Sequence, residues 1–353
     1  MHKKIAVLPG DGIGPEVTAQ ALRVLRTVAT RFGYTFDYTF ADVGAVAIDR
    51  HGDPLPEATL QVCREADAIL FGAIGHPKYD NDPSAEVRPE QGLLRLRKSL
   101  GLFANIRPVA LYPTLAHLSP LRADKLVGVD MVIYRELTGG IYFGEKGKTE
   151  NSAFDHCSYT AVEIDRIARL AFDAARTRRR KVTLVDKANV LETSRLWRSV
   201  VKKISAEYPD VTLDWMYVDN AAMQLIQYPA HFDVLLTENM FGDILSDEAS
   251  VLPGSLGLLP SASVGAKTAL FEPIHGSYPQ AAGQDIANPM AAILSVAMLL
   301  DSFQLTEAAD MVRDAVRELL ESGAGTADLQ TTTILRCSEV GSLLCRSIGA
   351  LVH

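Results

Sequence analysis

The chain of 353 residues has few cysteines and no long apolar run, the features that characterise disulfide-rich proteins and membrane proteins. Its four cysteines, Cys63, Cys157, Cys337 and Cys345, lack C-x-x-C spacing and are too few for a disulfide framework, so reduced thiols are expected. No apolar run approaches the roughly 18 residues of a membrane span, and the first apolar stretch is too short for a signal peptide. We therefore expect a soluble cytoplasmic protein that does not enter a membrane.

Basic residues are not in excess, since 35 Lys and Arg stand against 43 Asp and Glu for a net charge of −8. This balance argues against nucleic acid as a partner. The one basic run, from Arg176 to Lys181, is interpreted as a helix end that leads into a strand. The alternative, a nucleic-acid-binding patch at 178–181, would show strongly salt-dependent binding.

Short β-rich runs alternate with amphipathic helical stretches, as in residues 4–8, a helix from Pro15, and residues 66–74. This alternation predicts an α/β fold of mixed sheets flanked by helices. The length exceeds what one hydrophobic core usually organises, and the pattern changes near residues 102 and 254. We therefore expect one domain from 1–102 with 255–353, and a second from 103–254.

The middle third differs from the rest because residues 129–137 and 141–145 are extended segments on either side of a Thr-Gly-Gly turn. This pattern predicts an antiparallel hairpin, with an arm near 138–158.

The opening glycines, Gly10, Gly12 and Gly14, do not fit G-x-G-x-x-G, so a standard Rossmann cofactor site is not expected. They nevertheless predict a tight strand-to-helix turn, with Pro15 suited to the first helical position. Backbone amides of such a turn can meet a ligand.

Asp243 and Asp247 follow an apolar strand and lie four residues apart, which places both carboxylates on one face of a helix. Two like charges one turn apart are destabilising unless a cation lies between them, and a hard divalent cation suits oxygen ligands. The alternative is a solvated acidic helix face.

Three arginines from separate elements form the next group: Arg97, Arg107 and Arg135. An arginine inside an apolar strand needs a partner, and its planar fork matches a carboxylate of a substrate or of an internal salt bridge. Lys187 follows an apolar strand, at the end where α/β sheets place their chemistry, and a buried lysine there can act as a base. The alternative, which position alone favours, is a surface lysine after a strand. Tyr142 lies in the expected hairpin, where packing is the alternative role.

Ten motifs occur in a fixed order along nearly the whole chain: GDGIGPE, LLRLRK, FANIRP, RELTGGIYFGE, VDKANV, YVDNAAM, FGDILSD, GSLGLLPSAS, EPIHGS and IANP. In these motifs the chain resembles the β-decarboxylating dehydrogenases, the family of isocitrate and isopropylmalate dehydrogenases. The resemblance implies that family's two-domain fold. Residues 1–102 and 255–353 would form the cofactor side, and 103–254 the substrate, metal and dimerisation domain.

The resemblance also implies the roles of individual residues. Substrate carboxylates would be held by Arg97, Arg107 and Arg135, while Lys187 and Tyr142 would be catalytic, removing the hydroxyl proton and protonating the enolate. Magnesium or manganese would be bound by Asp219, Asp243 and Asp247, with Asp219 also at the substrate. Because Lys187 and Asp219 would come from the neighbouring subunit, each site would be complete only in a homodimer.

For the cofactor, the resemblance implies NAD, held by Ile13, His275, Gly276, Ser277, Tyr278, Gln280 and Asn288. Many family members have aspartate where this chain has Gln280. An amide can still bond the ribose hydroxyls, but it repels a 2′-phosphate less, so exclusion of NADP should be weaker.

For the substrate, the resemblance places Leu93, Leu94 and Val190 around the C3 substituent, and this apolar wall favours an isopropyl group. Glu90 would repel an anionic substituent. The implied reaction is oxidation and decarboxylation of 3-isopropylmalate to 2-oxo-4-methylpentanoate in leucine biosynthesis. The alternatives are isocitrate, homoisocitrate or tartrate as substrate, and a non-catalytic regulatory subunit, although no metal or base position is lost.

Overall fold

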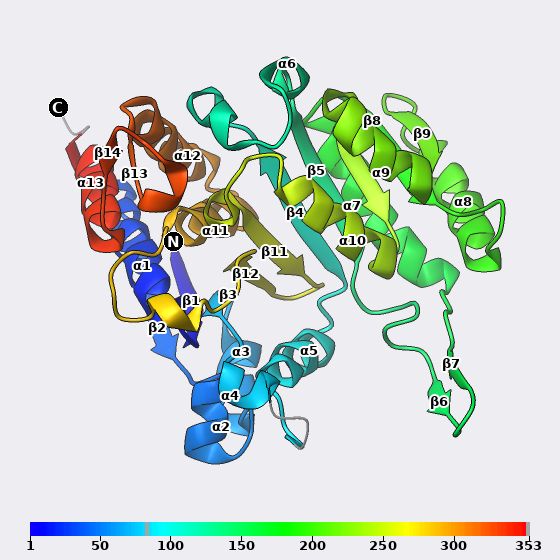
Figure 1. Cartoon of the computed structure of the whole chain (residues 1–353), viewed down its shortest axis with the longest axis horizontal. Helices are drawn as coiled ribbons and strands as arrows, with labels where there is room; N and C mark the ends of the chain where they lie inside the picture. Colours follow the sequence, from blue (N-terminus) through cyan, green and yellow to red (C-terminus); the bar gives the residue numbers. More distant parts are fainter. Residues whose placement is uncertain (82–84, 351–353) are drawn as a thin grey trace. The chain divides into compact units, whose positions relative to one another are not determined.

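The computed structural model describes residues 1–81 and 85–350, which form two compact units (Figure 1). The terminal unit comprises Met1–Gly101, Tyr112–Leu118 and the chain from Gly254 onward. The middle unit comprises Leu102–Leu111 and Ser119–Pro253. Each unit is mixed α/β, as the sequence predicts. The units differ from the predicted domains at Tyr112–Leu118, which groups with the terminal unit.

The terminal unit has five neighbouring strands, in the order β2 (Thr35–Phe40), β1 (His2–Gly10), β3 (Ala68–Ala73), β12 (Ala269–Pro273) and β11 (Pro260–Val264). The first four are parallel, and β11 pairs antiparallel with β12. Every residue of β3 is buried, as expected of a central parallel strand. A short parallel pair, β13 (Ala324–Gly325) and β14 (Thr333–Ile334), lies apart from this sheet.

Helix α1 (Gly14–Phe32) begins with Pro15 in its first turn, as predicted, and buries an apolar stripe that includes Val17, Ala21 and Val24. It packs on α11 and α13, and α11 is almost wholly buried. The helices of this unit after α1 are α2 (Ala45–His51), α3 (Glu57–Glu65), α4 (Pro77–Asp80), α5 (Pro89–Leu100), α11 (Met290–Ser302), α12 (Thr306–Glu321) and α13 (Cys337–Ala350).

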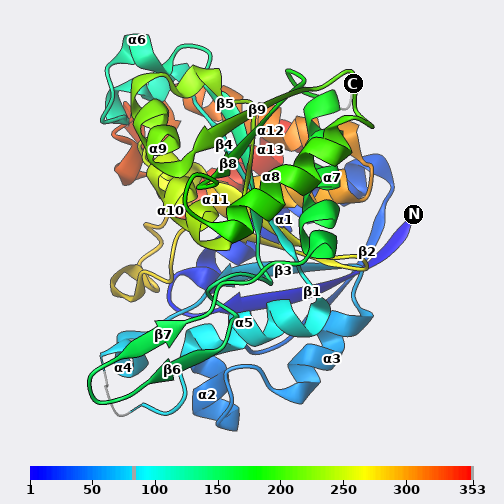
Figure 2. The ribbon, with the colours of Figure 1, turned by 90° about the vertical axis from the view of Figure 1, so that its right-hand side faces the viewer.

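The middle unit has the strand order β4 (Ala104–Ala110), β5 (Asp130–Glu136), β10 (Val234–Thr237), β8 (Lys181–Asp186) and β9 (Thr212–Tyr217). Only the β4–β5 pair is antiparallel in this series. Figure 2 shows α7 (Ala161–Arg176) and α8 (Glu192–Ser205) on one side of these strands, opposite α9 (Val218–Gln227) and α10 (Asn239–Ser250). A short helix, α6 (Ala123–Leu126), precedes β5. The core includes Met131, Ile133, Leu235 and Leu245.

The expected hairpin of 129–137 with 141–145 is wrong. Strand β5 pairs with β4 and β10 instead, and residues 141–143 form a turn. The physical reason is burial, because β5 is buried along almost its whole length and needs a strand on each side. An arm does exist within 138–158, formed by the antiparallel strands β6 (Lys146–Lys148) and β7 (Ala153–Asp155).

The basic run lies at the end of α7 and the start of β8, so its interpretation as a helix end leading into a strand is confirmed. Its arginines make internal ion pairs. Arg176 lies 2.9 Å from Asp210, and Arg178 lies 2.9 Å from the buried Asp233. Over residues 1–81 and 85–350, no helix is both long and apolar enough to cross a membrane.

Gly10 ends β1 against the backbone of β3. Its φ is +69°, and a Cβ there would lie 1.9 Å from the carbonyl oxygen of Ala73. We expect Gly10→Ala to lower the free energy of unfolding by at least about 3 kcal/mol, because the left-handed backbone and the overlap both oppose a side chain.

Gly33→Ala is the matched control, since Gly33 has a φ of +68° with open space around it. It should cost only about 1 kcal/mol, the strain of the left-handed conformation. Thermal unfolding of both variants separates the two terms. Equal losses of stability would contradict a role for the close approach to Ala73.

Candidate active site

In the middle unit, β5 and α10 bring Arg135 and Asp243 together. The Nη1 of Arg135 donates to Oδ1 of Asp243 at 2.5 Å, and the arginine side chain is only 8% exposed. The helix can approach this closely because residue 242 is glycine: a Cβ there would lie 2.8 Å from the Cβ of Arg135. Arg135 thus has the carboxylate partner that an arginine in an apolar strand requires. That partner is Asp243, which the family resemblance implies is a metal ligand.

Tyr142 joins the same group. Its hydroxyl donates to Oδ2 of Asp243 at 2.9 Å, and its ring centre lies 5.9 Å from the Arg135 guanidinium. Partial burial, with the Asp243 carboxylate beside it, raises the pKa of Tyr142. The phenol therefore keeps its proton at neutral pH.

The second strand arginine makes a parallel arrangement one helical turn further along α10. Arg107 on β4 donates through Nη1 to Asp247 at 2.8 Å and to Ser246 at 2.7 Å. Its Nε donates to Asn105 at 2.8 Å. Because Asp243 and Asp247 both lie within α10, the predicted four-residue spacing on one helix is confirmed.

The two aspartates fit a divalent cation as part of a larger ligand set. Their oxygen atoms face one side of α10 and are held by arginines whose charge they balance. Hard oxygen ligands of this kind suit Mg²⁺ and Mn²⁺. Across the part of the chain that the structure describes, no three His, Cys, Asp or Glu side chains gather closely enough to hold a metal.

Lys187 and Asp219 form a separate pair in the middle unit, with Nζ donating to Oδ1 at 2.7 Å. Lys187 lies in the turn after β8, and Asp219 lies in the first turn of α9. The hydrogen bond from Lys187 lowers the pKa of Asp219. Val190 lies in the same turn and is largely exposed, and its backbone N–H donates to the Lys187 carbonyl.

The turn that presents Lys187 is organised by Asp186, a residue that the sequence analysis did not single out. This buried carboxylate accepts hydrogen bonds from the Ala188 backbone at 2.9 Å and from two nitrogens of Arg198 at 2.8 Å. The backbone N–H of Lys187 donates to Ser194 at 3.0 Å. The sequence did offer a signal for Asp186, because an acidic residue at the end of an apolar strand needs hydrogen-bond partners.

Helix α5 in the terminal unit carries four predicted residues on one face. Glu90, Leu93, Leu94 and Arg97 follow the i, i+3, i+4, i+7 spacing of a single helical stripe. Arg97 donates to Glu272 on β12 at 2.7 Å. Its buried Nε has no hydrogen-bond partner among residues 1–81 and 85–350. This face thus combines an anion-binding group with an apolar surface.

The first glycine turn and the predicted cofactor loop contact each other in the terminal unit. The backbone N–H of Ile13 donates to the Ser277 carbonyl at 2.7 Å. A Cβ on Gly12, whose φ is +58°, would lie 2.0 Å from that same oxygen. Ser277 is buried, whereas Tyr278 is exposed with a φ of +38°. Gly276 and Gln280 are exposed in the same loop.

His275 and Asn288 are two further residues predicted to bind the cofactor. Burial lowers the pKa of His275, so its imidazole is neutral, and its buried Nε2 has no partner within the described part of the chain. Asn288 donates to Asp328 at 3.1 Å and accepts from the Met290 backbone at 3.0 Å. The structure thus brings Ile13 against Ser277, two residues after His275, and anchors Asn288 to Asp328.

Asp11, between the two positive-φ glycines of the first turn, is a further residue that the sequence analysis missed. Its carboxylate is 5% exposed and accepts hydrogen bonds from the backbones of Ala45, Val46 and Gly75 at 2.8 to 3.0 Å. Burial raises the pKa of Asp11. It connects the first turn to the start of α2 and to the loop after β3.

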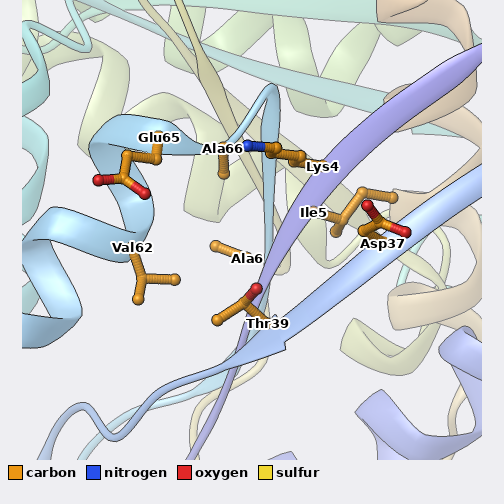
Figure 3. Close-up of a pocket in the computed structure, with 8 residues that line it drawn as sticks. All are labelled: Lys4, Ile5, Ala6, Asp37, Thr39, Val62, Glu65 and Ala66. Atoms are coloured by element: carbon orange, nitrogen blue, oxygen red, sulfur yellow. The ribbon is translucent and has the colours of Figure 1, made fainter.

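A pocket of about 160 Å³ lies elsewhere in the terminal unit, beside β1, β2 and α3 (Figure 3). It is lined by Lys4, Ile5, Ala6, Asp37, Thr39, Val62, Glu65 and Ala66. None of the predicted site residues lines it. The candidate active site is therefore identified by its charged groups, not by this pocket.

Known proteins resemble this chain over nearly its whole length. The family model "Isocitrate/isopropylmalate dehydrogenase" matches residues 4–344. The chain is 56% identical over 330 residues to the 3-isopropylmalate dehydrogenase of Bacteroides fragilis, covering 94% of each chain. It is 54% identical over 358 residues to that of Nitratidesulfovibrio vulgaris, covering 99% of this chain and 100% of the relative.

Among solved structures, an isocitrate dehydrogenase from Methylococcus capsulatus superposes with a TM-score of 0.86 at 36% identity, covering 99% of this chain and 100% of the other. The match in both sequence and structure extends over nearly the full length. The chain therefore belongs to the isocitrate/isopropylmalate dehydrogenase family.

Proposed function

We propose that the chain catalyses the NAD-dependent oxidative decarboxylation of 3-isopropylmalate to 2-oxo-4-methylpentanoate, a step of leucine biosynthesis in the cytoplasm. The observation that carries this proposal is the pairing of Arg135 with Asp243 and of Arg107 with Asp247, beside the hydroxyl of Tyr142. The relatives named 3-isopropylmalate dehydrogenase, at 54% and 56% identity, support this substrate.

The paired arginines provide the substrate site. Their guanidinium groups are mostly buried, so each needs an anionic partner, and in this structure aspartates fill that role. Substrate carboxylates bind the same forks and release oxygen atoms of Asp243 and Asp247. Asp243 and Asp247 would hold Mg²⁺ or Mn²⁺, which would supply Lewis-acid stabilisation of negative charge on the substrate oxygen.

Two side chains move the protons of the reaction. Lys187 removes the C2 hydroxyl proton while hydride leaves C2 for the nicotinamide, with Asp219 holding its Nζ at 2.7 Å. The C3 carboxylate then leaves as carbon dioxide, and its electron pair forms an enolate. Tyr142, whose phenol remains protonated, donates a proton to C3. Arg135 and Arg107 keep the substrate in place throughout.

NAD occupies the terminal unit in this proposal. The Ile13–Ser277 contact forms a backbone surface for the cofactor, and the neutral His275 offers an Nε2 with unused hydrogen-bonding capacity. Gly276, Tyr278 and Asn288 complete this site, and the exposed Gln280 reaches the ribose hydroxyls. Position 280 carries no positive charge for a 2′-phosphate, so NAD is preferred over NADP.

A homodimer with shared active sites is part of the proposal. Helices α9 and α10 pack together and leave apolar side chains about half exposed, namely Met223, Ile226, Ile244 and Val251. An apolar surface of this kind is typical of an interface, and the exposed two-stranded arm is marginally stable alone. A second copy would cover both features and bring its own Lys187 and Asp219 to Asp243 and Asp247.

The rival substrate is isocitrate, which the solved relative from Methylococcus capsulatus carries in its name. Leu93 and Leu94 on α5 disfavour it, because an apolar wall would leave its third carboxylate buried without a partner. The test is NADH or NADPH formation with 3-isopropylmalate, isocitrate and tartrate, each with NAD and NADP and with Mn²⁺. Turnover of 3-isopropylmalate with NAD is expected, and turnover confined to isocitrate would contradict the proposal.

Leu93→Asn is expected to lower kcat/KM for 3-isopropylmalate by about 10-fold or more, because an amide replaces apolar contact with the isopropyl group. Ser99→Asn is the control, since Ser99 is exposed elsewhere on α5. Steady-state kinetics of both variants make the comparison. An unchanged kcat/KM in Leu93→Asn would show that Leu93 does not line the pocket.

A further inference from the structure

We propose that Asn239 is a positioning residue that holds both Arg135 and the turn leading to Tyr142 in their active arrangement. The inference rests on the proposed function and assigns a role to a residue that touches neither substrate nor metal. Asn239 is the first residue of α10, and it is 1% exposed. A buried polar amide needs hydrogen-bond partners, so the contacts of the Asn239 side chain indicate what it does.

The side-chain oxygen of Asn239 orients the guanidinium of Arg135. It accepts hydrogen bonds from Nε at 3.1 Å and from Nη2 at 2.9 Å, while Nη1 points to Asp243. A neutral amide fixes the plane of the fork without neutralising its charge. Arg135 therefore retains a positive charge for a substrate carboxylate, which an aspartate at position 239 would compete for.

The other half of the amide holds the turn that follows β5. Nδ2 of Asn239 donates to the Gly139 carbonyl at 3.1 Å. Tyr159 packs against the same turn, so closely that a Cβ on Gly140 would lie 2.2 Å from the Tyr159 hydroxyl oxygen. The same hydroxyl oxygen accepts a hydrogen bond from the Asn239 backbone N–H at 2.9 Å. Two residues beyond Gly140, Tyr142 reaches Asp243. The Asn239 amide thus connects Arg135, which would bind a substrate carboxylate, to the turn that leads to Tyr142, the proposed proton donor.

Helix capping does not explain Asn239, because the preceding residue performs it. The Glu238 carboxylate accepts from the Phe241 backbone N–H at 2.6 Å and from the Tyr159 hydroxyl at 2.9 Å. Asn239 itself directs both ends of its side chain away from the helix, to Arg135 and Gly139. Its contacts therefore serve the site, not the helix end.

The test compares Asn239→Asp and Asn239→Ser with the wild-type protein. Asn239→Asp has the same shape and keeps an oxygen acceptor, but adds a negative charge beside Arg135 and loses the donor to Gly139. We expect the KM for 3-isopropylmalate to rise by about 10-fold or more, the loss expected for one charge-assisted hydrogen bond. The KM for NAD should change little, because the groups that the Asn239 side chain contacts belong to the middle unit.

Gln304→Glu provides the matched control, since it makes the same amide-to-carboxylate change at an exposed turn. Asn239→Ser removes most of both contacts without adding charge, and should also raise the KM for 3-isopropylmalate. A wild-type KM in both Asn239 variants, or equal rises for substrate and NAD, would overturn the positioning role. A wild-type protein that does not turn over 3-isopropylmalate would instead overturn the proposed function.

Discussion

Replacing Asp243 with Asn is expected to reduce kcat/KM for 3-isopropylmalate on the order of a thousand-fold, because a metal ion contributes several kcal/mol of charge stabilisation to such reactions. The amide cannot balance the charge of a divalent cation. The change also removes the ion-pair partner of Arg135 and leaves a single side-chain oxygen where Tyr142 and Arg135 each bonded one of two. Steady-state kinetics across a Mn²⁺ titration, with direct measurement of Mn²⁺ binding, provide the readout.

Asp310→Asn is the matched control, because it breaks an Arg–Asp pair at a helix surface, with Arg313 at 2.9 Å, away from every proposed site residue. Its activity should equal that of the wild type, since exposed ion pairs contribute little. Normal Mn²⁺ binding and normal turnover in Asp243→Asn would contradict the assignment of Asp243 as a metal ligand.

Mixing two inactive variants is expected to restore activity. Lys187→Met and Asp243→Asn should each be nearly inactive alone, because each variant dimer lacks one required group in both of its sites. In a mixed dimer, one site would combine the intact Lys187 of one chain with the intact Asp243 of its partner. After unfolding and refolding together, random pairing should give about a quarter of wild-type activity, as expected for a symmetric dimer.

A control mixture of Asp243→Asn with Arg135→Ala removes two groups that the same chain contributes to one site. In the mixed dimer each site would then still lack one of these two groups, so no recovery is expected. Recovery of about a quarter would require the two residues to come from different chains. Recovery in the second mixture and none in the first would contradict the shared site. If neither mixture recovered activity although mixed dimers had formed, Lys187 would act within its own chain.

Local sequence patterns predicted the parts of the site that depend on one element. The four-residue spacing of Asp243 and Asp247 is sufficient to place both on one side of α10. An arginine in an apolar strand needs a partner, and Arg135 has one in Asp243. These predictions succeeded because periodicity within a helix or strand does not depend on distant residues.

The sequence did not reveal the contacts between residues far apart in the chain. The hairpin prediction failed because β5 pairs with strands whose sequence positions lie before and well after it. Asp11 reaches residues 34 and 64 positions away, and Asn239 reaches Arg135 across 104 positions. No local pattern marks such polar residues, because their role depends on which strands and loops the topology brings together.

The most direct test of the proposed reaction is to measure NADH and carbon dioxide together in one assay of the wild-type protein with 3-isopropylmalate, NAD and Mn²⁺. The proposed function predicts both products in equal amounts, with 2-oxo-4-methylpentanoate as the remaining product, and loss of all three when a chelator is added. NADH without carbon dioxide would show oxidation alone. Neither product from 3-isopropylmalate, with both formed from isocitrate, would contradict the assigned substrate.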